Sequence, residues 1–293
     1  MISFSSKAPM GNRFRGRIMD ITLTSAVRNN VLTLQMIGDQ QSVIQNRLST
    51  GKKVNSALDD PRNFFQASSL NNRANDLGRR LDGMGLAIKT IEAADKGITA
   101  LTRIAENMAA VSKQAADSNS AAERATLLAQ FNELRTQMIN VARDSGFNGT
   151  NLLAAQNLTV AFNEDATSTM SVTAVSWVAA DPAGVPAGAD WGDADLAVGA
   201  AAIATSATAV NNAIGSLRTQ AAAFGTSLTT VKVREEFTKG MMNTLKGGAD
   251  GLVLADQNEE AANLLALNTR QQLSQQALSL AAQSEQSILR LFG

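Results

Sequence analysis

The chain has 293 residues, of which 44% are hydrophobic but only 4% aromatic, and it contains neither histidine nor cysteine. Its 26 basic and 26 acidic side chains cancel, so no overall charge favours binding to nucleic acid or to an anionic membrane. The missing residue types exclude disulfides, thiolate sites and the zinc-dependent, Ser–His and Cys–His mechanisms that need an imidazole or a thiol.

Residues 1–19 are basic and show no periodicity, so they are expected to be a disordered leader or an upstream-start extension, with Met19 as the true start. A functional basic arm is the alternative. No apolar run approaches the roughly 18 to 20 residues of a membrane span. No apolar region follows the basic start, so export by a signal peptide is not indicated. No cofactor, metal or catalytic site is expected.

A seven-residue repeat from Thr24 to Thr50 predicts a helix with one thin apolar stripe. Asn30 and Gln41 interrupt this stripe with polar side chains. So narrow a stripe does not stabilise an isolated helix, and the helix therefore needs a partner. The stripe consists of Val27, Leu34, Ile37, Ile44 and Leu48.

The stretch RLSTGKKVNSALDDPRNFF, residues 47–65, separates this helix from the next. Gly51 can adopt the left-handed conformation that ends a helix, and Asp60 before Pro61 is typical of a helix start. Residues 51–60 are therefore predicted to form an extended connector. The polar residues expected to tie it to its neighbours are Arg47, Asn55, Asp59 and Asp60.

A second helix is predicted from about Pro61 to Ala116, with Gly83 and Gly85 inside it. Each glycine destabilises the helix by about 1 kcal/mol relative to alanine. Either a close approach of another helix or a need for flexibility at this point would explain why glycine occurs here. The apolar rows of this helix contain Leu70, Leu77, Leu81, Met84, Ile88, Ile91 and Ile98. A capping-box pattern at Ser120 and Glu123 opens a third helix, which ends at Gly146.

Beyond this helix, Asn148–Gly149 predicts a turn, and 158–162 alternates in the manner of a strand against 170–172, which predicts a hairpin. Residues 176–200 break every period and are expected to form an exposed loop, with both tryptophans packed locally on the hairpin. Hydroxyl side chains in this region are candidates for glycosylation, although a solvated loop has the same composition. They are Thr167, Ser168, Thr169, Ser171 and Thr173.

A long helix is predicted from about Ala201 to Lys246, and it needs a partner as long as the second helix. Its rows contain Val210, Ile214, Leu217, Phe224, Leu228 and Val231. Gly247, Gly248 and Gly251 are expected to break it. A last helix begins near Asp256, and its apolar face includes Leu264, Leu267, Leu273, Leu280, Ile288, Leu291 and Phe292.

The predicted fold is mainly α: elongated antiparallel helical-bundle or coiled-coil rods with a small β-hairpin region. Two marginal helices with unpartnered stripes stand at opposite ends of the chain. This layout suits a self-assembling protein, in which neighbouring copies supply the missing apolar surface.

Three stretches carry a resemblance to bacterial flagellins. The run RLSTGKKVNSALDDPRNFFQASSL resembles their N-terminal region, FNGTNLL resembles the segment that enters their outer part, and ADQNEEAANLLALNTRQQLSQQALSLAAQSEQSILRLF resembles their C-terminal region. The resemblance covers residues 20–292 and is weakest over 154–200. The FF pair and the LRLFG ending are most similar to alphaproteobacterial flagellins.

The resemblance implies a division of the chain into layers. The terminal helices, 20–50 and 251–293, would pair as an inner coiled coil in the filament, with 51–60 as the spoke between layers. Residues 61–153 and 201–250 would form the rod domain, and 154–200 a β-hairpin and reduced outer segment. The terminal parts, up to about Asn55 and beyond about Gly251, are expected to become ordered only on assembly.

The resemblance also implies a function: a secreted structural subunit of the extracellular flagellar filament, with no enzymatic activity and no membrane insertion. Its implied partners are further copies of itself, an export chaperone at the C-terminal helix, the filament cap and hook–filament junction proteins, and the flagellar type III export apparatus. The alternative is a hook–filament junction protein of the same family. A generic coiled-coil scaffold would explain the heptads but not RLSTGKKVNSALDDP, and a metallopeptidase insert would need histidine ligands.

Overall fold

The computed structural model describes residues 25–179 and 184–292, without the side chains of Ala26, Glu285 and residues 288–292. The expected leader 1–19, with its proposed start at Met19, lies outside the described residues. The chain divides into two compact units. Unit 1 contains residues 1–60 and 253–293, and unit 2 contains residues 61–252.

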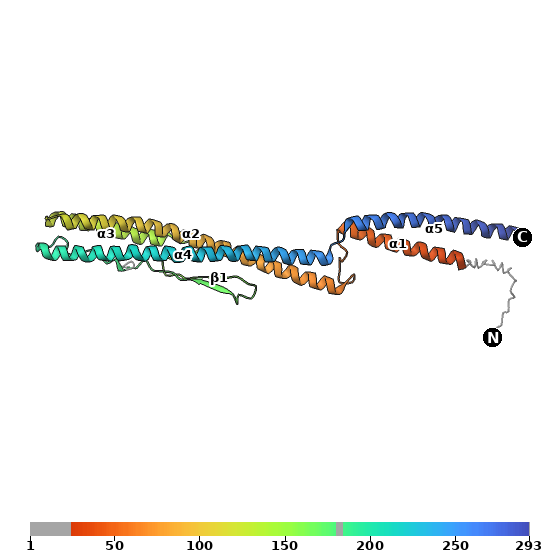
Figure 1. Ribbon diagram of the computed structural model, residues 1–293, viewed down its shortest axis with the longest axis horizontal. Coiled ribbons are helices and arrows are strands. Elements are labelled where there is room, and N and C mark those ends of the chain that lie inside the picture. Colours follow the sequence, from red (N-terminus) through yellow and green to blue (C-terminus); the bar gives the residue numbers. More distant parts are fainter. Residues whose placement is uncertain (1–24, 180–183, 293) are drawn as a thin grey trace, which may run out of the picture. The chain divides into compact units, whose positions relative to one another are not determined.

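Unit 2 is a bundle of long helices with a small sheet beside it (Figure 1). Its elements are α2 (Pro61–Asp117), α3 (Ala121–Asp144), β1 (Leu158–Ala161), β2 (Thr169–Val172) and α4 (Leu196–Val253). Helix α3 folds back on α2 after a short turn, and α4 runs antiparallel along α2, where Lys232 lies 4.0 Å from Glu92. The expected fold class, mainly α with a small antiparallel sheet, is confirmed.

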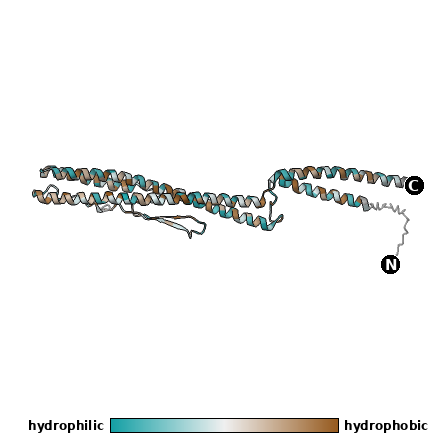
Figure 2. Cartoon of the chain, in the orientation of Figure 1, coloured by the Kyte–Doolittle hydropathy of each residue, from teal (hydrophilic) through white to brown (hydrophobic). Residues whose placement is uncertain are grey.

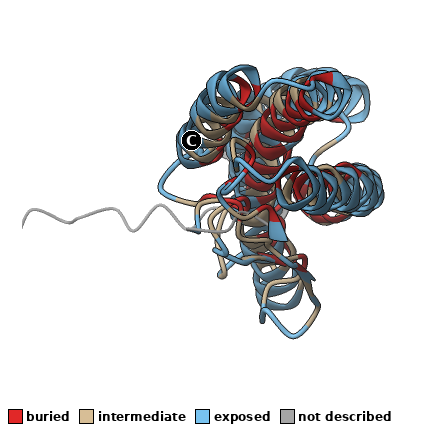
Figure 3. Ribbon diagram, turned by 90° about the vertical axis from the view of Figure 1, so that its left-hand side faces the viewer, coloured by how far each residue is buried: buried red, intermediate tan, exposed pale blue. Residues whose placement is uncertain are grey.

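The heptad rows of α2 and α4 face the interior of this bundle, and the buried residues gather where helices meet (Figure 3). Thr238, a polar residue on the α4 row, is also buried, and its hydroxyl is paired because it donates to the Arg234 carbonyl at 2.8 Å. Most row residues are buried: Leu77, Met84, Ile88, Ile91, Ile98, Val210, Ile214, Leu217, Phe224 and Val231. Leu70, Leu81 and Leu228 are half-buried.

Gly97 of α2 lies close against the segment that follows α3. A Cβ added there would lie 2.6 Å from Leu153 Cδ1 and would also collide with the Ser145 side chain. Gly83 and Gly85, in contrast, have nothing within 4 Å of such a Cβ. Close packing within the chain therefore does not explain Gly83 and Gly85.

The capping box at the start of α3 is confirmed in one of its two halves. The Ser120 hydroxyl accepts from the Glu123 N–H at 3.4 Å, as expected for an N-cap. The Glu123 carboxylate instead accepts from the Ser118 hydroxyl at 2.7 Å, and the Ser120 N–H donates to that same hydroxyl at 3.1 Å. One extra serine therefore links the two halves of the motif.

The turn and the hairpin form where the sequence predicts them. Asn148 and Gly149 both have positive φ, of 49° and 79°, in a turn closed by the Phe147–Thr150 bridge. Strands β1 and β2 are antiparallel, with Val160 opposite Met170. The alternating apolar side chains of the two strands point towards the bundle because α2 packs against β1.

Apart from residues 180–183, the segment from 176 to the start of α4 at Leu196 forms the predicted loop, but it packs partly on α3 instead of lying exposed throughout. Trp177 and Trp191 are fully buried, and the Trp191 ring lies 4.9 Å from the ring of Phe131 on α3. Glycines permit this packing: a Cβ at Gly188 would lie 2.6 Å from Leu128, and a Cβ at Gly192 would lie 2.8 Å from the Ala125 Cβ. The glycines that suggested a solvated loop therefore let the backbone lie directly on α3.

Helix α4 also differs from its prediction at both ends. It begins at Leu196 rather than Ala201, and it continues to Val253 through Gly247, Gly248 and Gly251. A helical glycine costs only about 1 kcal/mol, and burial of neighbouring side chains offsets that cost. Leu245 and Ala249, one turn apart, are both buried.

Among the described residues, α4 is long and apolar enough, by length and composition alone, to cross a membrane. This corrects the expectation that no stretch reaches that length. The buried row of α4 packs into the core of unit 2. A core helix of a folded domain can be as long and as apolar as a membrane span.

Unit 1 is an antiparallel pair of helices, α1 (Ser25–Thr50) and α5 (Gln257–Phe292). In Figure 2 both helices alternate between polar and apolar residues along their length. The expected cap of α5 is confirmed, because the Asp256 carboxylate accepts from the N–H groups of Asn258 at 2.9 Å and Glu259 at 3.3 Å.

The glycines of α2 give a matched test of this packing. We expect Gly97→Ala to destabilise unit 2 by about 1 kcal/mol or more, because the added methyl group overpacks the contact with Ser145 and Leu153. Gly83→Ala should instead stabilise it by about 0.5–1 kcal/mol, since its position is open. Urea denaturation of the two variants measures both changes, and equal effects would contradict the assigned contact.

Candidate assembly surfaces and connector

The connector begins with a helix end at Gly51. Its φ of 70° is left-handed, and its N–H donates to the Arg47 carbonyl at 2.8 Å. This confirms the predicted end of α1 at Thr50. The Thr50 hydroxyl donates to the Asn46 carbonyl at 2.8 Å and accepts from the Lys52 N–H at 3.3 Å, which completes the termination.

The connector then pairs with the segment that leads into α5. The N–H groups of Lys53 and Val54 donate to the Val253 carbonyl at 2.8 and 3.3 Å, and the Ala255 N–H donates to the Gly51 carbonyl at 3.0 Å. Val54 is buried beneath this pairing. Two segments about 200 residues apart in sequence are thus joined through their backbones within unit 1.

Asp59 organises the second half of the connector. Its Oδ2 accepts from the N–H groups of Asn55 and Ser56, both at 2.9 Å, and from the Ser56 hydroxyl at 3.2 Å. The Ser56 and Asn55 N–H groups, followed by the Ser56 hydroxyl and the charge of Arg47, hold the pKa of Asp59 below its usual value. The Asn55 side chain donates to the Lys52 carbonyl at 3.4 Å.

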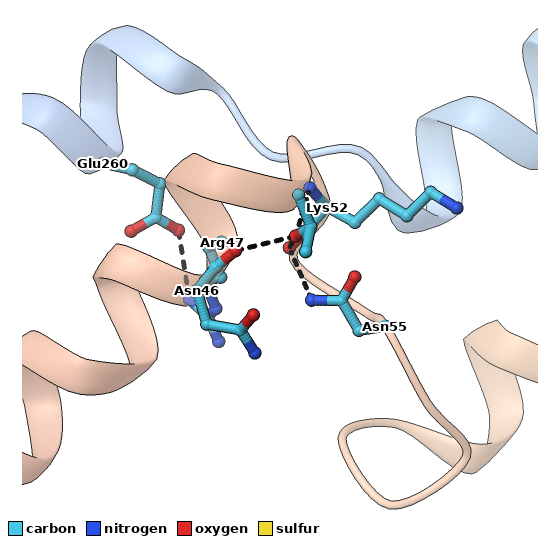
Figure 4. Close-up of polar contacts among 6 residues, drawn as sticks. Asn46, Arg47, Lys52, Asn55 and Glu260 are labelled. Carbon is cyan, nitrogen blue, oxygen red and sulfur yellow. Dashed lines mark hydrogen bonds and ion pairs between the residues drawn. The ribbon is translucent and has the colours of Figure 1, made fainter.

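An ion pair links the last turn of α1 to the first turn of α5. Arg47 Nη1 lies 3.1 Å from Glu260 Oε1, and Figure 4 shows the two side chains turned towards each other. Glu260 is buried, whereas the arginine side chain is 39% exposed. Arg47, Gly51, Asn55 and Asp59 therefore take part in one local network. Asp60 lies at the end of the connector, directly before Pro61, the first residue of α2.

The seam between α1 and α5 is narrow. Val27, Ile37 and Leu267 are buried in it. The other predicted residues that the structure places here are half-buried: Leu34, Ile44, Leu48 and Leu264. Gln41 is also buried, and its amide group donates to Asn268 Oδ1 at 2.8 Å and to Gln271 Oε1 at 3.1 Å.

Both helices of unit 1 carry a second apolar stripe that the seam does not cover. Leu273 and Leu280, predicted to belong to the inner face, are 60% and 65% exposed. The side chains of Ile288, Leu291 and Phe292 lie outside the described residues. The exposed stripes contain Leu32, Met36 and Val43 on α1 and Leu265, Leu273 and Leu280 on α5.

An open groove of about 490 Å³ lies between the two helices. Val43, Ile44 and Leu267 give it apolar walls, and Asp39 and Arg270 bring opposite charges to its lining. The groove is thus shaped for an apolar side chain surrounded by polar groups.

The sequence did not indicate the contacts that hold the hairpin on the bundle. Arg73 forms an ion pair with Glu164, and Arg80 donates to the Glu164 carbonyl at 2.9 Å. The backbone N–H of Glu164 and then Arg73 hold the pKa of this carboxyl group below its usual value. The Arg234 guanidinium lies 5.3 Å from the centroid of the Phe162 ring. These partners lie far apart in sequence, and no local pattern pairs them.

The predicted glycosylation candidates lie on and beside β2. Ser168 is half-buried, and the remaining four candidates, Thr167, Thr169, Ser171 and Thr173, are exposed. Among the residues that the structure describes, no group of three or more acidic, histidine or cysteine side chains is placed to hold a metal ion.

Two family models match the chain: the bacterial flagellin N-terminal helical region over residues 22–158, and the bacterial flagellin C-terminal helical region over residues 207–292. Flagellin FljO of Caulobacter vibrioides is 30% identical over 252 residues, which cover 85% of this chain and 89% of the relative. Flagellin C of Rhizobium meliloti is 26% identical over 89% of this chain and 95% of its own length.

A flagellin of Brucella melitensis is 27% identical over 93% of this chain and 98% of its own length. The crystal structure of Bacillus cereus flagellin matches 52% of this chain and 86% of its own, with a TM-score of 0.44 and 17% identity.

Long paired helices with a small antiparallel sheet define a class of mainly α-helical bundle proteins. The sequence matches identify the member of this class. The chain belongs to the bacterial flagellin family, with relatives in alphaproteobacteria, and it is a structural subunit of the flagellar filament.

The connector carries a pH-dependent contribution from Asp59. Folding lowers the pKa of this group, so its carboxylate stabilises the connector. This stabilisation is complete above the ordinary aspartate pKa of about 3.9 and is lost as the pH falls through the pKa of the folded state. We expect Asp59→Ala in assembled protein at neutral pH to speed hydrogen exchange at the Asn55 and Ser56 amides. Asp82→Ala, which changes an exposed aspartate on α2, is the control. Unchanged exchange at both amides would contradict the assigned role of Asp59.

Proposed function

We propose that this flagellin polymerises with itself through the second apolar stripes of α1 and α5. The observation that supports this is the pair of stripes at helical spacing, uncovered on two helices whose other faces already meet each other. Leu273 and Leu280 are each more than half exposed. Full burial of one leucine side chain contributes about 1.5–3 kcal/mol, so a few such contacts per subunit suffice to drive assembly.

The groove between α1 and α5 offers a receptor for the α5 stripe, Leu265, Leu273 and Leu280. In a filament of identical subunits the contacts are heterologous, so a protruding stripe on one copy must meet a different surface on the next. The apolar walls at Val43, Ile44 and Leu267 fit an apolar side chain, and the charges of Asp39 and Arg270 lie beside them. A stripe inserted in this groove would exclude water from both surfaces.

The two units divide the work of the subunit in this proposal. Unit 1 forms the inner core of the filament, and residues 51–60 form the spoke. Unit 2, with its large core, is the rod domain that folds within a single chain. The hairpin and the segment packed on α3 provide the reduced outer surface.

The same proposal includes export and delivery. Residues up to about Asn55 and beyond about Gly251 become ordered on assembly, which allows a flagellar type III export apparatus to secrete the chain in an extended form. An export chaperone covers the C-terminal helix before assembly. The filament cap and the hook–filament junction proteins contact the ends of the filament, and no enzymatic step is involved.

Nucleated polymerisation of the purified chain, followed by electron microscopy, tests this function. Filaments that grow from added seeds are the expected result. Expression in a strain that lacks other flagellins separates a filament subunit from a hook–filament junction protein, because only the former would build a long filament. Failure to elongate seeds under any salt condition would contradict the proposal.

Substitutions in the α5 stripe test the surface itself. We expect Leu273→Ser and Leu280→Ser to raise the critical concentration for polymerisation at least about tenfold each, because each removes an apolar contact between subunits. Urea unfolding of unit 2 should not change. Val198→Ser, an exposed apolar position on α4, is the matched control. Polymerisation of both α5 variants at the unmodified concentration would show that this stripe is not the contact surface.

A further inference from the structure

A single buried polar layer interrupts the apolar seam of α1 and α5. Gln41 is only 9% exposed, and its amide group donates to both Asn268 and Gln271, one helical turn apart on α5. The seam residues on either side of it on α1, Ile37 and Ile44, are apolar. The layer therefore places a hydrogen-bonded amide cluster where the heptad pattern calls for an aliphatic side chain.

The apolar rows alone do not determine how the two helices align. The apolar seam residues of α1, Ile37 and Ile44, are seven residues apart, so a slip of one heptad keeps each of them within the seam. The apolar row of α1 can also be buried against the α5 helix of a neighbouring copy. In an assembly of identical chains each α1 is offered many partner helices, and burial of apolar area does not discriminate among them.

The polar layer distinguishes the observed register from registers shifted by one heptad. A slip of one heptad would bring either Ala261 and Leu264 or Gln275 and Leu278 opposite Gln41. The first slip leaves the Gln41 amide without a polar partner. In both slips Asn268 and Gln271 would instead face a leucine of α1, Leu34 or Leu48.

The Arg47–Glu260 ion pair supports the same alignment from the end of the seam. It lies two helical turns from Gln41, and in one of the two slips Arg47 would face Leu267. The backbone hydrogen bonds of the connector anchor only the start of α5. Within the seam, only the observed alignment gives the Gln41 amide both of its polar partners, Asn268 and Gln271.

We propose that Gln41, with Asn268 and Gln271, selects the register of the α1–α5 pair and so prevents out-of-register pairing, within the chain or with a neighbouring copy, during assembly. This inference rests on the proposed polymerisation. A buried amide layer contributes specificity at a cost in stability, since an aliphatic side chain in its place would bury more apolar surface. Replacement by leucine is therefore predicted to leave the helix pair stable but poorly aligned.

Disulfide trapping measures the alignment directly, because the chain has no cysteine of its own. The pair Ile44→Cys with Leu267→Cys reports the observed register, since both positions line the same groove. The pair Ile44→Cys with Ser274→Cys reports the register shifted by one heptad. Each pair is placed in the full-length chain and oxidised after polymerisation, and gel electrophoresis separates disulfides within one chain from disulfides between chains.

With Gln41 present we expect only the first pair to form a disulfide within the chain. In a Gln41→Leu background the shifted pair and the disulfides between chains should increase at least roughly fivefold, the shift expected when an unpaired buried amide no longer penalises the wrong alignment. Gln41→Asn, which keeps an amide, should restore most of the original selectivity. Gln45→Leu, the same substitution at an exposed position of α1, should change nothing.

Polymer yield and disulfide pattern together separate a failure of self-assembly from a failure of the role of Gln41. Sedimentation of the same samples reports polymer yield, and an unmodified chain that does not polymerise from seeds would overturn the self-assembly on which the inference rests. If the unmodified chain polymerises and Gln41→Leu shows the same disulfide pattern, polymerisation stands and the role of Gln41 is overturned. Circular dichroism of Gln41→Leu polymer confirms that its helices are formed.

Discussion

The narrow seam between α1 and α5 is the constraint on which the properties of this flagellin depend. Among the described residues, the buried apolar side chains of unit 1 are Val27, Ile37, Val54, Val253 and Leu267. Unit 2 buries its helices on a continuous core that includes two tryptophans and three phenylalanines. Because helices gain most of their stability from such burial, unit 2 has enough core to fold alone, and unit 1 gains from contacts with further copies.

The two units consequently use polar groups in different ways. In unit 2 polar groups fasten the hairpin to a fold that apolar packing already stabilises, as Arg73 and Glu164 do. In unit 1 the polar groups lie within the seam and at its end, where apolar area is scarce. There Gln41 and the Arg47–Glu260 pair restrict which alignment is possible, and the connector holds the two helices together through backbone hydrogen bonds.

Much of the fold could be predicted from local pattern. The heptad rows located the long helices, and Gly51 marked the end of α1 because its left-handed conformation is a local property of glycine. The contacts that the sequence did not reveal are tertiary. Trp191 is buried because Gly188 and Gly192 let the chain lie on α3, and Gly248 stays helical because its neighbours pack into the core. In both places glycine acts through packing rather than through its freedom to turn.

Hydrogen exchange on the free chain and on the polymer tests the central claim most directly, because it reports each helix separately. The account predicts that amides of α1 and α5 exchange quickly in the dilute monomer and become strongly protected in the polymer. Amides buried in α2 and α4 should be protected in both states. Strong protection of α1 and α5 at low concentration, unchanged on polymerisation, would contradict the claim that unit 1 depends on its neighbours.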